Sequence, residues 1–324
     1  MVDGGLGIRG KNPKSEIQNP KSVDLSTRIG PLCLKNPVLT ASGTFGYGSE
    51  YADLVDLSRL GGIVTKAVTP EPRAGNPPPR VVETTGGMLN AIGLANVGVN
   101  AFVWEKMPFL RTCGTTVIVN VAGRTVEDYV HVARVLDPCP GVHGLEINVS
   151  CPNVREGGLS FGASPARTAE VVRKLKTVTD LPLIVKLTPN VTDIVAVARA
   201  AEEAGADALS LINTLVGMAI DVDTRRPKLG NITGGLSGPA IRPVAVAMVW
   251  KVAQQVRIPV IGIGGVTCAA DALEFLIAGA CAVQVGTATF IEPRTVLQVV
   301  VGLEQYLLRE GFCSLSDVVG SLET

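Results

Sequence analysis

The chain has 324 residues, and its 29 lysines and arginines balance 29 aspartates and glutamates, so the formal net charge is zero. This balance argues against a broad nucleic-acid-binding surface and against a polybasic membrane-binding surface. Residues of the set AVILMFWYC make up 46% of the sequence, enough to form a large core, so we expect the main body to be folded.

The 7 cysteines are widely scattered, and no two of them form a CxxC pair. Their spacing therefore gives no signal for structural zinc or for an iron–sulfur cluster held by this chain's own thiolates. An odd number of unclustered cysteines is typical of reduced thiols in a cytoplasmic protein. Because only 2 histidines are present, His131 and His143, catalytic chemistry must depend on other residue types.

Residues 1–23 are rich in Gly, Lys, Asn, Pro and Ser and lack both the apolar segment of a signal peptide and an amphipathic period. We expect them to form a flexible tail. The rest of the chain, residues 24–324, needs no domain boundary and is predicted to be one domain. No uninterrupted apolar run reaches the ~18 residues of a membrane span, so the sequence predicts a soluble, cytoplasmic protein.

After residue 24, short apolar runs rich in β-branched residues alternate with longer segments of helical period. The predicted strands cover residues 37–42, 62–67, 115–121, 144–149, 183–187, 208–212, 259–262 and 282–285. The predicted helices cover residues 97–110, 126–136, 164–177, 192–204, 241–256, 268–278 and 294–309, with a short, weaker helix at 51–58.

This alternation predicts an α/β fold with a parallel sheet, and eight such units fit a TIM (β/α)8 barrel better than an open doubly wound sheet, which remains the alternative. Residues 24–35 are predicted to form an N-terminal hairpin. Three insertions, 71–96, 152–163 and 214–239, follow the second, fourth and sixth strands. A barrel builds its active site after its strands, so we expect these insertions to border the site.

Glycines follow the last two predicted strands: Gly262, Gly264 and Gly265 after the seventh, and Gly286, with Thr287, after the eighth. Barrel enzymes often bind a phosphate with these two loops, because glycine lets backbone N–H groups approach the ligand closely. The alternative is that the glycines only turn the chain. If a phosphate binds, it could belong to a phosphosugar or to a phosphorylated cofactor.

Cys151 lies in the segment EINVSCPN, residues 146–153, directly after the fourth predicted strand. The other six cysteines are expected to be inert, but this one is surrounded by carboxamides and a hydroxyl that could bind a planar polar substrate. A nucleophilic cysteine normally needs a histidine, and His131 and His143 are predicted to lie away from this loop. A thiolate that accepts a proton is the better role, and an ordinary pKa of about 8.5 would then favour alkaline pH.

Two lysines end or interrupt apolar strands: Lys66 closes the second and Lys186 lies within the fifth. A charge inside such a strand is costly unless it is paired. Lys186 could therefore belong to a structural ion pair, or it could face an anionic ligand or the charge that develops on a reduced cofactor. Asn213 and Thr214 end the sixth strand at the same rim.

Taken together, these motifs resemble those of the class 1 dihydroorotate dehydrogenases, specifically the NAD-linked class 1B catalytic subunit. The resemblance runs from about residue 25 to near the C-terminus. Its anchors, all in the family's order, are Ala41-Ser42-Gly43, Thr65-Lys66, Gly75-Asn76-Pro77, segments 90–94 and 148–153, Val185-Lys186, Ile212-Asn213-Thr214, segment 234–238, Gly264-Gly265 and Gly286-Thr287.

The resemblance implies an FMN-containing barrel that oxidises (S)-dihydroorotate to orotate in pyrimidine biosynthesis. By position, the residues implied to contact FMN are Ser42, Lys66, Ala67, Asn120, Asn148, Lys186, Ile212, Gly238, Gly264, Gly265, Gly286 and Thr287. Those implied to hold dihydroorotate are Lys66, Asn90, Ala91, Ile92, Gly93, Leu94, Asn148, Asn213 and Thr214. Cys151 matches the base that removes the C5 proton while hydride passes from C6 to FMN, and Lys186 would stabilise the charge on the flavin.

Cys151 also bears on the subclass, because the membrane-linked class 2 enzymes carry serine as the base. The segments 90–94 and 157–162 resemble class 1B, whereas the fumarate-using class 1A usually places Ser-Met after the first of these asparagines. The chain departs from the 1B pattern at Ala95 and Val97, where Gln and Pro are common, and at Ser164, where an acid is common. Residues 1–22 match nothing in the family.

Class 1B enzymes pass electrons to NAD through a separate subunit with FAD and a [2Fe–2S] cluster. We therefore expect such a partner, in a heterotetramer around a homodimer, since this chain shows neither cluster spacing nor the GxGxxG fingerprint of an NAD site. The alternatives are a class 1A-like enzyme that uses fumarate and an FMN barrel that acts on another dihydropyrimidine. More distant are a phosphosugar isomerase or aldolase and a non-catalytic scaffold.

Overall fold

The computed structural model describes residues 22–149 and 161–323. Eight parallel strands close into a barrel whose order around the ring follows the order in the chain. They are β3 (Val38–Thr40), β4 (Gly62–Val64), β7 (Thr116–Val121), β8 (Gly144–Asn148), β9 (Leu183–Lys186), β10 (Ala208–Leu211), β15 (Val260–Ile263) and β16 (Ala282–Val285). Because β16 also pairs with β3, the TIM barrel prediction is confirmed and the open sheet is excluded.

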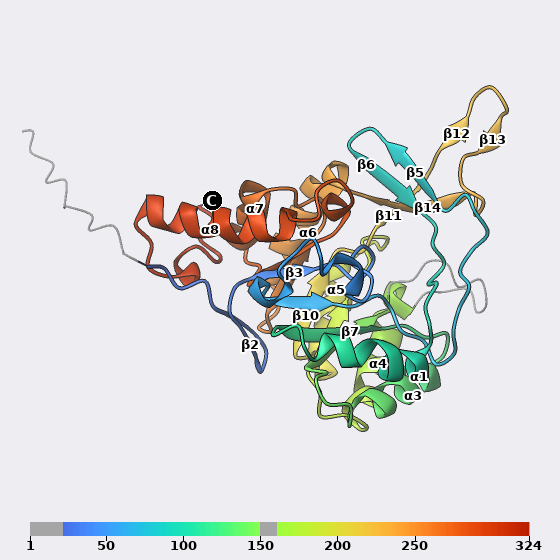
Figure 1. Cartoon of the computed structure of the whole chain (residues 1–324), viewed down its shortest axis with the longest axis horizontal. Coiled ribbons are helices and arrows are strands. Elements are labelled where there is room, and N and C mark those ends of the chain that lie inside the picture. The colour runs from blue at the N-terminus through green and yellow to red at the C-terminus, as the bar shows by residue number, and fades with distance from the viewer. Residues whose placement is uncertain (1–21, 150–160, 324) are drawn as a thin grey trace, which may run out of the picture.

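Helices surround this barrel (Figure 1). The long ones are α3 (Val126–Leu136), α4 (Pro165–Lys176), α5 (Ile194–Glu203), α6 (Arg242–Ala253), α7 (Ala269–Ile277) and α8 (Thr295–Glu310), close to their predicted bounds. The predicted helix 97–110 consists of α1 (Val99–Ala101), a π-helical segment η3 (Phe102–Lys106) and α2 (Met107–Leu110). Pro108, which has no N–H to donate, is the second residue of α2, just after the π-helical segment.

The prediction of a helix at residues 51–58 is wrong. The structure has two 3₁₀ turns there, η1 (Ser49–Tyr51) and η2 (Leu57–Arg59). Asp56 lies between them in extended conformation, and its side chain accepts the N–H of Ser58 at 3.1 Å. A short polar side chain that binds the backbone in this way competes with a continuous helix.

The N-terminal hairpin is confirmed as β1 (Thr27–Ile29) paired with β2 (Leu32–Leu34). Ile29 and Leu34 join the apolar cluster inside the barrel, which also contains Ile118 and Ile184. Thr27 Oγ1 donates to the carbonyl oxygen of Cys281, directly before β16, at 2.9 Å. The hairpin therefore covers the N-terminal ends of the strands and leaves the opposite end of the barrel for a binding site.

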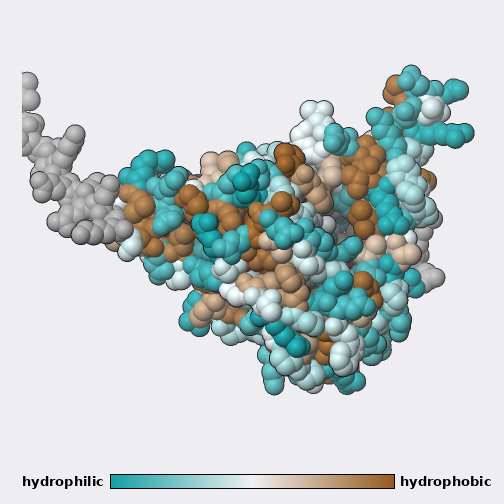
Figure 2. Space-filling model, in the orientation of Figure 1, coloured by the Kyte–Doolittle hydropathy of each residue, from teal (hydrophilic) through white to brown (hydrophobic). Residues whose placement is uncertain are grey.

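The insertions after the second and sixth barrel strands pair with each other in one antiparallel sheet. Its order is β11 (Leu215–Met218), β14 (Thr233–Ser237), β6 (Gly87–Asn90) and β5 (Val81–Thr84). A second hairpin, β12 (Ile220–Asp221) with β13 (Arg226–Pro227), projects beyond it (Figure 1). Exposed apolar side chains gather on this side of the molecule (Figure 2), among them Val216, Met218, Ile220 and Val222.

Short 3₁₀ turns complete the described chain: η4 (Phe161–Ala163), η5 (Pro239–Ile241), η6 (Thr287–Phe290) and η7 (Leu315–Asp317). The predicted insertion 152–163 lies almost wholly outside the described residues. Among the helices of residues 22–149 and 161–323, none has the length and apolar character needed to cross a membrane.

Candidate active site

The inside of the barrel changes from apolar to polar along the strands. Alternate strand residues face inward, so Ile118 and Ile184 lie in the apolar cluster near the hairpin. One inward position further, the side chains of Asn120, Glu146 and Ser210 are buried, and both Asn120 and Ser210 donate to the Glu146 carboxylate. The barrel interior thus becomes polar as it approaches the C-terminal ends of its strands.

Glu146 is the centre of this polar layer and is completely buried. Its Oε1 accepts from Asn120 Nδ2 at 2.7 Å and from Lys186 Nζ at 3.4 Å. Its Oε2 accepts from Ser210 Oγ at 2.9 Å and from Gln284 Nε2 at 2.6 Å. These contacts come from four other barrel strands, β7, β9, β10 and β16, and satisfy a carboxylate that would otherwise be costly to bury.

Lys186 combines the two roles that its sequence position allows. Its ammonium pairs with Glu146 and also donates to Ser42 Oγ at 3.1 Å. The same side chain lines a cavity of about 240 Å³ at the C-terminal end of the barrel. Lys186 therefore forms a buried ion pair and also presents its positive charge to the cavity.

This cavity is bordered by almost all of the expected site residues. Those that line it are Ser42, Lys66, Ala67, Asn90, Ile92, Gly93, Leu94, Asn148, Lys186, Ile212, Asn213, Thr214, Gly238, Gly264, Gly265, Gly286 and Thr287. Asn120 lies beneath the cavity, where its Oδ1 accepts from Asn148 Nδ2 at 3.4 Å, and Ala91 is fully buried behind it. Cys151 lies outside the described residues. Which ligand each residue contacts stays a prediction.

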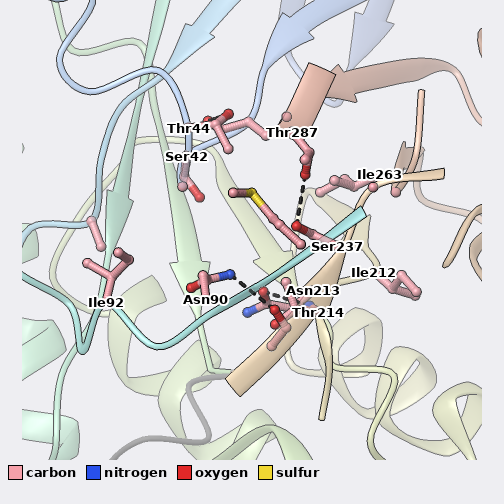
Figure 3. A pocket seen from close by; sticks show the side chains of 18 of the residues that line it. Ser42, Thr44, Asn90, Ile92, Ile212, Asn213, Thr214, Ser237, Ile263 and Thr287 are labelled. Atoms are coloured by element: carbon pink, nitrogen blue, oxygen red, sulfur yellow. Dashed lines mark hydrogen bonds between the residues drawn. The ribbon is translucent and has the colours of Figure 1, made fainter. Parts of the chain in front are cut away.

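The antiparallel sheet contributes polar side chains to the same space (Figure 3). Asn90, at the end of β6, donates to the carbonyl oxygen of Gly235 in β14 at 3.3 Å. Thr287, after β16, donates to Ser237 Oγ at 2.8 Å, so the sheet is tied to the last barrel strand. The cavity thus lies between the barrel rim and the inserted sheet.

The glycine loops present backbone donors to the cavity. Gly264 and Gly265 have φ angles of 133° and 73°, which favour glycine. Within the described residues, neither of their N–H groups donates to another backbone or side-chain acceptor. A Cβ on Gly265 would lie 2.7 Å from the carbonyl oxygen of Gly238, so no larger residue fits this approach. The loop after β15 can therefore offer N–H groups to an anionic ligand.

The structure also places here several residues that sequence motifs alone do not assign to the site. Thr44, Met88, Ser237, Ile263 and Phe290 also line the cavity. Their types carry no catalytic signal, and two of them reach the site only because the distant insertions pair. Glu146 is different: it is a charge within an apolar strand, the same signal that identified Lys186, and it could have been predicted from that signal.

The family model described as dihydroorotate dehydrogenase matches residues 24–307. The chain belongs to the dihydroorotate dehydrogenase family. It is 58% identical over 300 residues to the "Dihydroorotate dehydrogenase B (NAD(+)), catalytic subunit" of Geotalea daltonii, a match that covers 93% of this chain and 98% of the relative. The protein of the same name in Geobacter metallireducens is 56% identical over 303 residues, which cover 94% of this chain and 99% of the relative.

For a member of the dihydroorotate dehydrogenase family, the departures from the class 1B pattern are local. Ser164 Oγ accepts from Arg167 N–H at 3.5 Å and so caps α4, and Ala95 lines the cavity. His131 lies exposed on α3, and His143 precedes β8, where its Nδ1 accepts from Val117 N–H at 3.0 Å. Neither histidine lines the cavity, as the sequence predicts.

Proposed function

We propose that this chain oxidises (S)-dihydroorotate to orotate in pyrimidine biosynthesis, as the catalytic subunit of an NAD-linked enzyme. The observation that supports this most directly is the cavity at the C-terminal end of the barrel. It brings Lys66, Asn148 and Lys186 from the barrel together with Asn90 from the inserted sheet and Asn213 from the loop after β10. Cations and carboxamides in one space suit a planar substrate with amide edges and a carboxylate.

The residues of the cavity also fit FMN. The two N–H groups of Gly264 and Gly265 suit its phosphate, while Lys186 and Asn148 lie at the barrel centre, where the ring system would bind. Bound FMN would supply the acceptor for the hydride from C6 of the substrate. Lys186, held by Glu146 and Ser42, places a positive charge where negative charge develops on reduction.

The chain itself would bind the substrate and move one proton. Lys66 is proposed to bind the substrate carboxylate, with the backbone of residues 92–94 beside it. Asn90, Asn148 and Asn213 would hold the amide edges of the ring. Cys151, which lies outside the described residues, is proposed to take the C5 proton as a thiolate. The Cys151→Ala variant should slow flavin reduction by ~10²-fold or more while FMN stays bound.

The name of the relatives, "catalytic subunit", supports a partner for this chain as well. We propose a heterotetramer in which a second subunit with FAD and a [2Fe–2S] cluster accepts the electrons, around a homodimer of this chain in the cytoplasm. The division between an N-terminal tail, residues 1–23, and a single catalytic domain, residues 24–324, also stays a prediction. Paired reconstitution tests the partner: full NAD reduction by this chain alone would contradict it.

One experiment separates the proposed substrate from its alternatives. Under anaerobic conditions, the purified oxidised protein should lose its yellow absorbance with dihydroorotate and not with dihydrouracil, which lacks the carboxylate. Bleaching by dihydrouracil would favour the alternative dihydropyrimidine dehydrogenase. Fumarate or NAD is then added to the reduced protein: rapid reoxidation by fumarate would favour a class 1A-like enzyme. A protein that neither contains nor takes up FMN would overturn the proposed function.

A further inference from the structure

A buried carboxylate lies directly beneath the cavity without lining it. Glu146 is fully buried and does not belong to the cavity wall. The barrel layer below it is apolar, with Ile118 and Ile184 at the neighbouring inward positions. Apolar residues in place of the whole buried Glu146–Lys186 pair would avoid the cost of burying two charges, so stability alone does not account for this pair.

Two chains of contacts connect this carboxylate to the cavity. The first is direct: Glu146 Oε1 lies 3.4 Å from Lys186 Nζ, and Lys186 lines the cavity. The second passes through an amide: Asn120 Nδ2 donates to Glu146 at 2.7 Å, and Asn120 Oδ1 accepts from Asn148 Nδ2 at 3.4 Å. Asn148 also lines the cavity. Glu146 therefore contacts one residue of the site, Lys186, directly and a second, Asn148, through Asn120.

The amide chain has a direction that the carboxylate sets. An ionised carboxylate only accepts hydrogen bonds, so Asn120 must turn its NH₂ group toward Glu146. Its oxygen then faces Asn148, which must turn its own NH₂ group toward Asn120. The acceptor oxygen of Asn148 is consequently on the other side of that amide. A glutamine at position 146 could donate as well as accept and would no longer impose this direction.

We infer that Glu146 is a positioning residue for the reaction: it is the counter-ion that holds Lys186 and the anchor that orients the Asn120–Asn148 amides. This inference rests on the proposed function, because it concerns how the site treats FMN and orotate. The carboxylate touches neither ligand and acts only through these residues. Its negative charge also offsets the positive charge of Lys186, so it sets the net charge beneath the proposed flavin site.

The test compares Glu146→Gln with Ser210→Ala as a matched control. Glutamine keeps the size of the side chain, and it can accept from Asn120 and Lys186 while donating to Ser210 and a reoriented Gln284. Ser210→Ala removes one donor to the same carboxylate but leaves its charge. The readout is the midpoint potential of bound FMN, measured against a reference dye.

In Glu146→Gln the counter-charge of Lys186 is lost, so reduced FMN should be favoured. The ratio of reduced to oxidised FMN at a fixed dye potential should rise about tenfold, while Ser210→Ala should change it little. An unchanged or more negative potential in Glu146→Gln, or an equal shift in Ser210→Ala, would overturn the inference.

A second variant decides the matter if Glu146→Gln does not fold. Asn120→Ala breaks the amide chain and leaves the Glu146–Lys186 pair in place. Orotate affinity, followed by the flavin absorbance, should then fall about tenfold. Unchanged orotate affinity would overturn the inference. Wild-type protein that binds no FMN would instead show that the proposed function, and the inference with it, is wrong.

Discussion

Asn90 Nδ2 lies 3.3 Å from the carbonyl oxygen of Gly235, and this contact joins two insertions that follow different barrel strands. β6 ends at Asn90, and Gly235 is its partner residue in β14. Because the NH₂ group of Asn90 is used in this way, its oxygen is the group that can accept from a ligand N–H. The pairing of the two insertions thus orients a side chain that both the resemblance and the cavity place at the site.

We expect Asn90→Ala to raise the KM for dihydroorotate about tenfold or more, because one hydrogen bond to the substrate is lost. FMN should remain bound, since this side chain comes from the inserted sheet and not from the glycine loops. The measurement is steady-state kinetics together with the flavin content. Glu83→Gln, an exposed position on the neighbouring strand β5, is the matched control and should behave as wild type. An unchanged KM in Asn90→Ala would remove this residue from substrate binding.

Lys66→Met tests the recognition of the substrate carboxylate. Methionine keeps the length of the side chain without its charge, so affinity for orotate should fall ~10- to 100-fold, as expected for the loss of a charged hydrogen bond. Uracil, which lacks the carboxylate, should bind the wild type and the variant equally. Both affinities can be followed through the absorbance of bound FMN. Equal losses for the two ligands would show that Lys66 does not recognise the carboxylate.

Gly265→Ala tests the loop after β15, with Gly320→Ala as a control at a glycine of almost identical φ angle. The φ angles are 73° and 71°, so alanine is strained by a similar amount at both positions, about 1–2 kcal/mol. Only at Gly265 would the Cβ meet a close neighbour, the carbonyl oxygen of Gly238 at 2.7 Å, whereas nothing lies within 4 Å at Gly320. Gly265→Ala should therefore bind FMN at least tenfold more weakly, and Gly320→Ala normally. Equal FMN affinity in both variants would contradict a role for this loop in binding.

The sequence predicts the barrel well because each strand is a short apolar run bounded by glycine or proline. β16, for example, has the predicted bounds, and the helix α3 does too. The sequence does not predict that β6 pairs with β14, because this pairing joins distant segments that have no local signal for each other. The helix expected at 51–58 fails for the opposite reason: the local signal was present, but Asp56 binds the backbone instead.

In the site too, residues with a local sequence signal are predicted, whereas those placed by the pairing of distant segments are not. Lys66, Asn148 and Lys186 end or interrupt apolar strands, so their place at one rim follows from the parallel barrel. Met88 and Ser237 line the cavity only because the inserted sheet folds over the rim, and nothing in their residue types indicates this. Asn120 is a polar residue in the otherwise apolar strand β7, but the sequence does not show that its side chain donates to Glu146 and lies beneath the cavity rather than in its wall.

Thiol labelling should separate Cys151 from the cysteines that the structure describes. Burial raises the pKa of Cys281 to about 12, so its thiol should remain unlabelled by a maleimide at pH 8. Cys33, Cys268 and Cys313 are exposed and should react. In a variant with these three replaced by serine, one remaining fast site that orotate protects would support Cys151 as the base. Peptide mapping identifies the labelled residue, and fast labelling of Cys281 would contradict its burial.

Asp271 should stabilise the fold in a pH-dependent way. Burial by itself would raise the pKa of this carboxyl, but hydrogen bonds from Thr267 and the charge of Arg242 outweigh it and lower the pKa. The carboxylate accepts from Thr267 N–H at 2.8 Å and pairs with Arg242, so it connects the loop after β15 to α7 and α6. We expect Asp271→Asn to lower the free energy of unfolding by about 1–3 kcal/mol at pH 7.

Because the folded-state pKa of Asp271 lies below its unfolded value, the stabilisation is present above the unfolded pKa, about 3.9, and is lost as the pH falls through the folded value. Urea unfolding at several pH values should therefore show a constant difference between wild type and Asp271→Asn from pH 6 to 8, and a smaller one below pH ~4. Asp221→Asn is the control: hydrogen bonds from Thr224 lower the pKa of Asp221 too, but this side chain lies at the surface on the short hairpin strand β12 and is less buried than Asp271, so the variant should unfold much as wild type does. A difference for Asp271→Asn that stays the same down to pH ~3 would show that its charge does not contribute to stability.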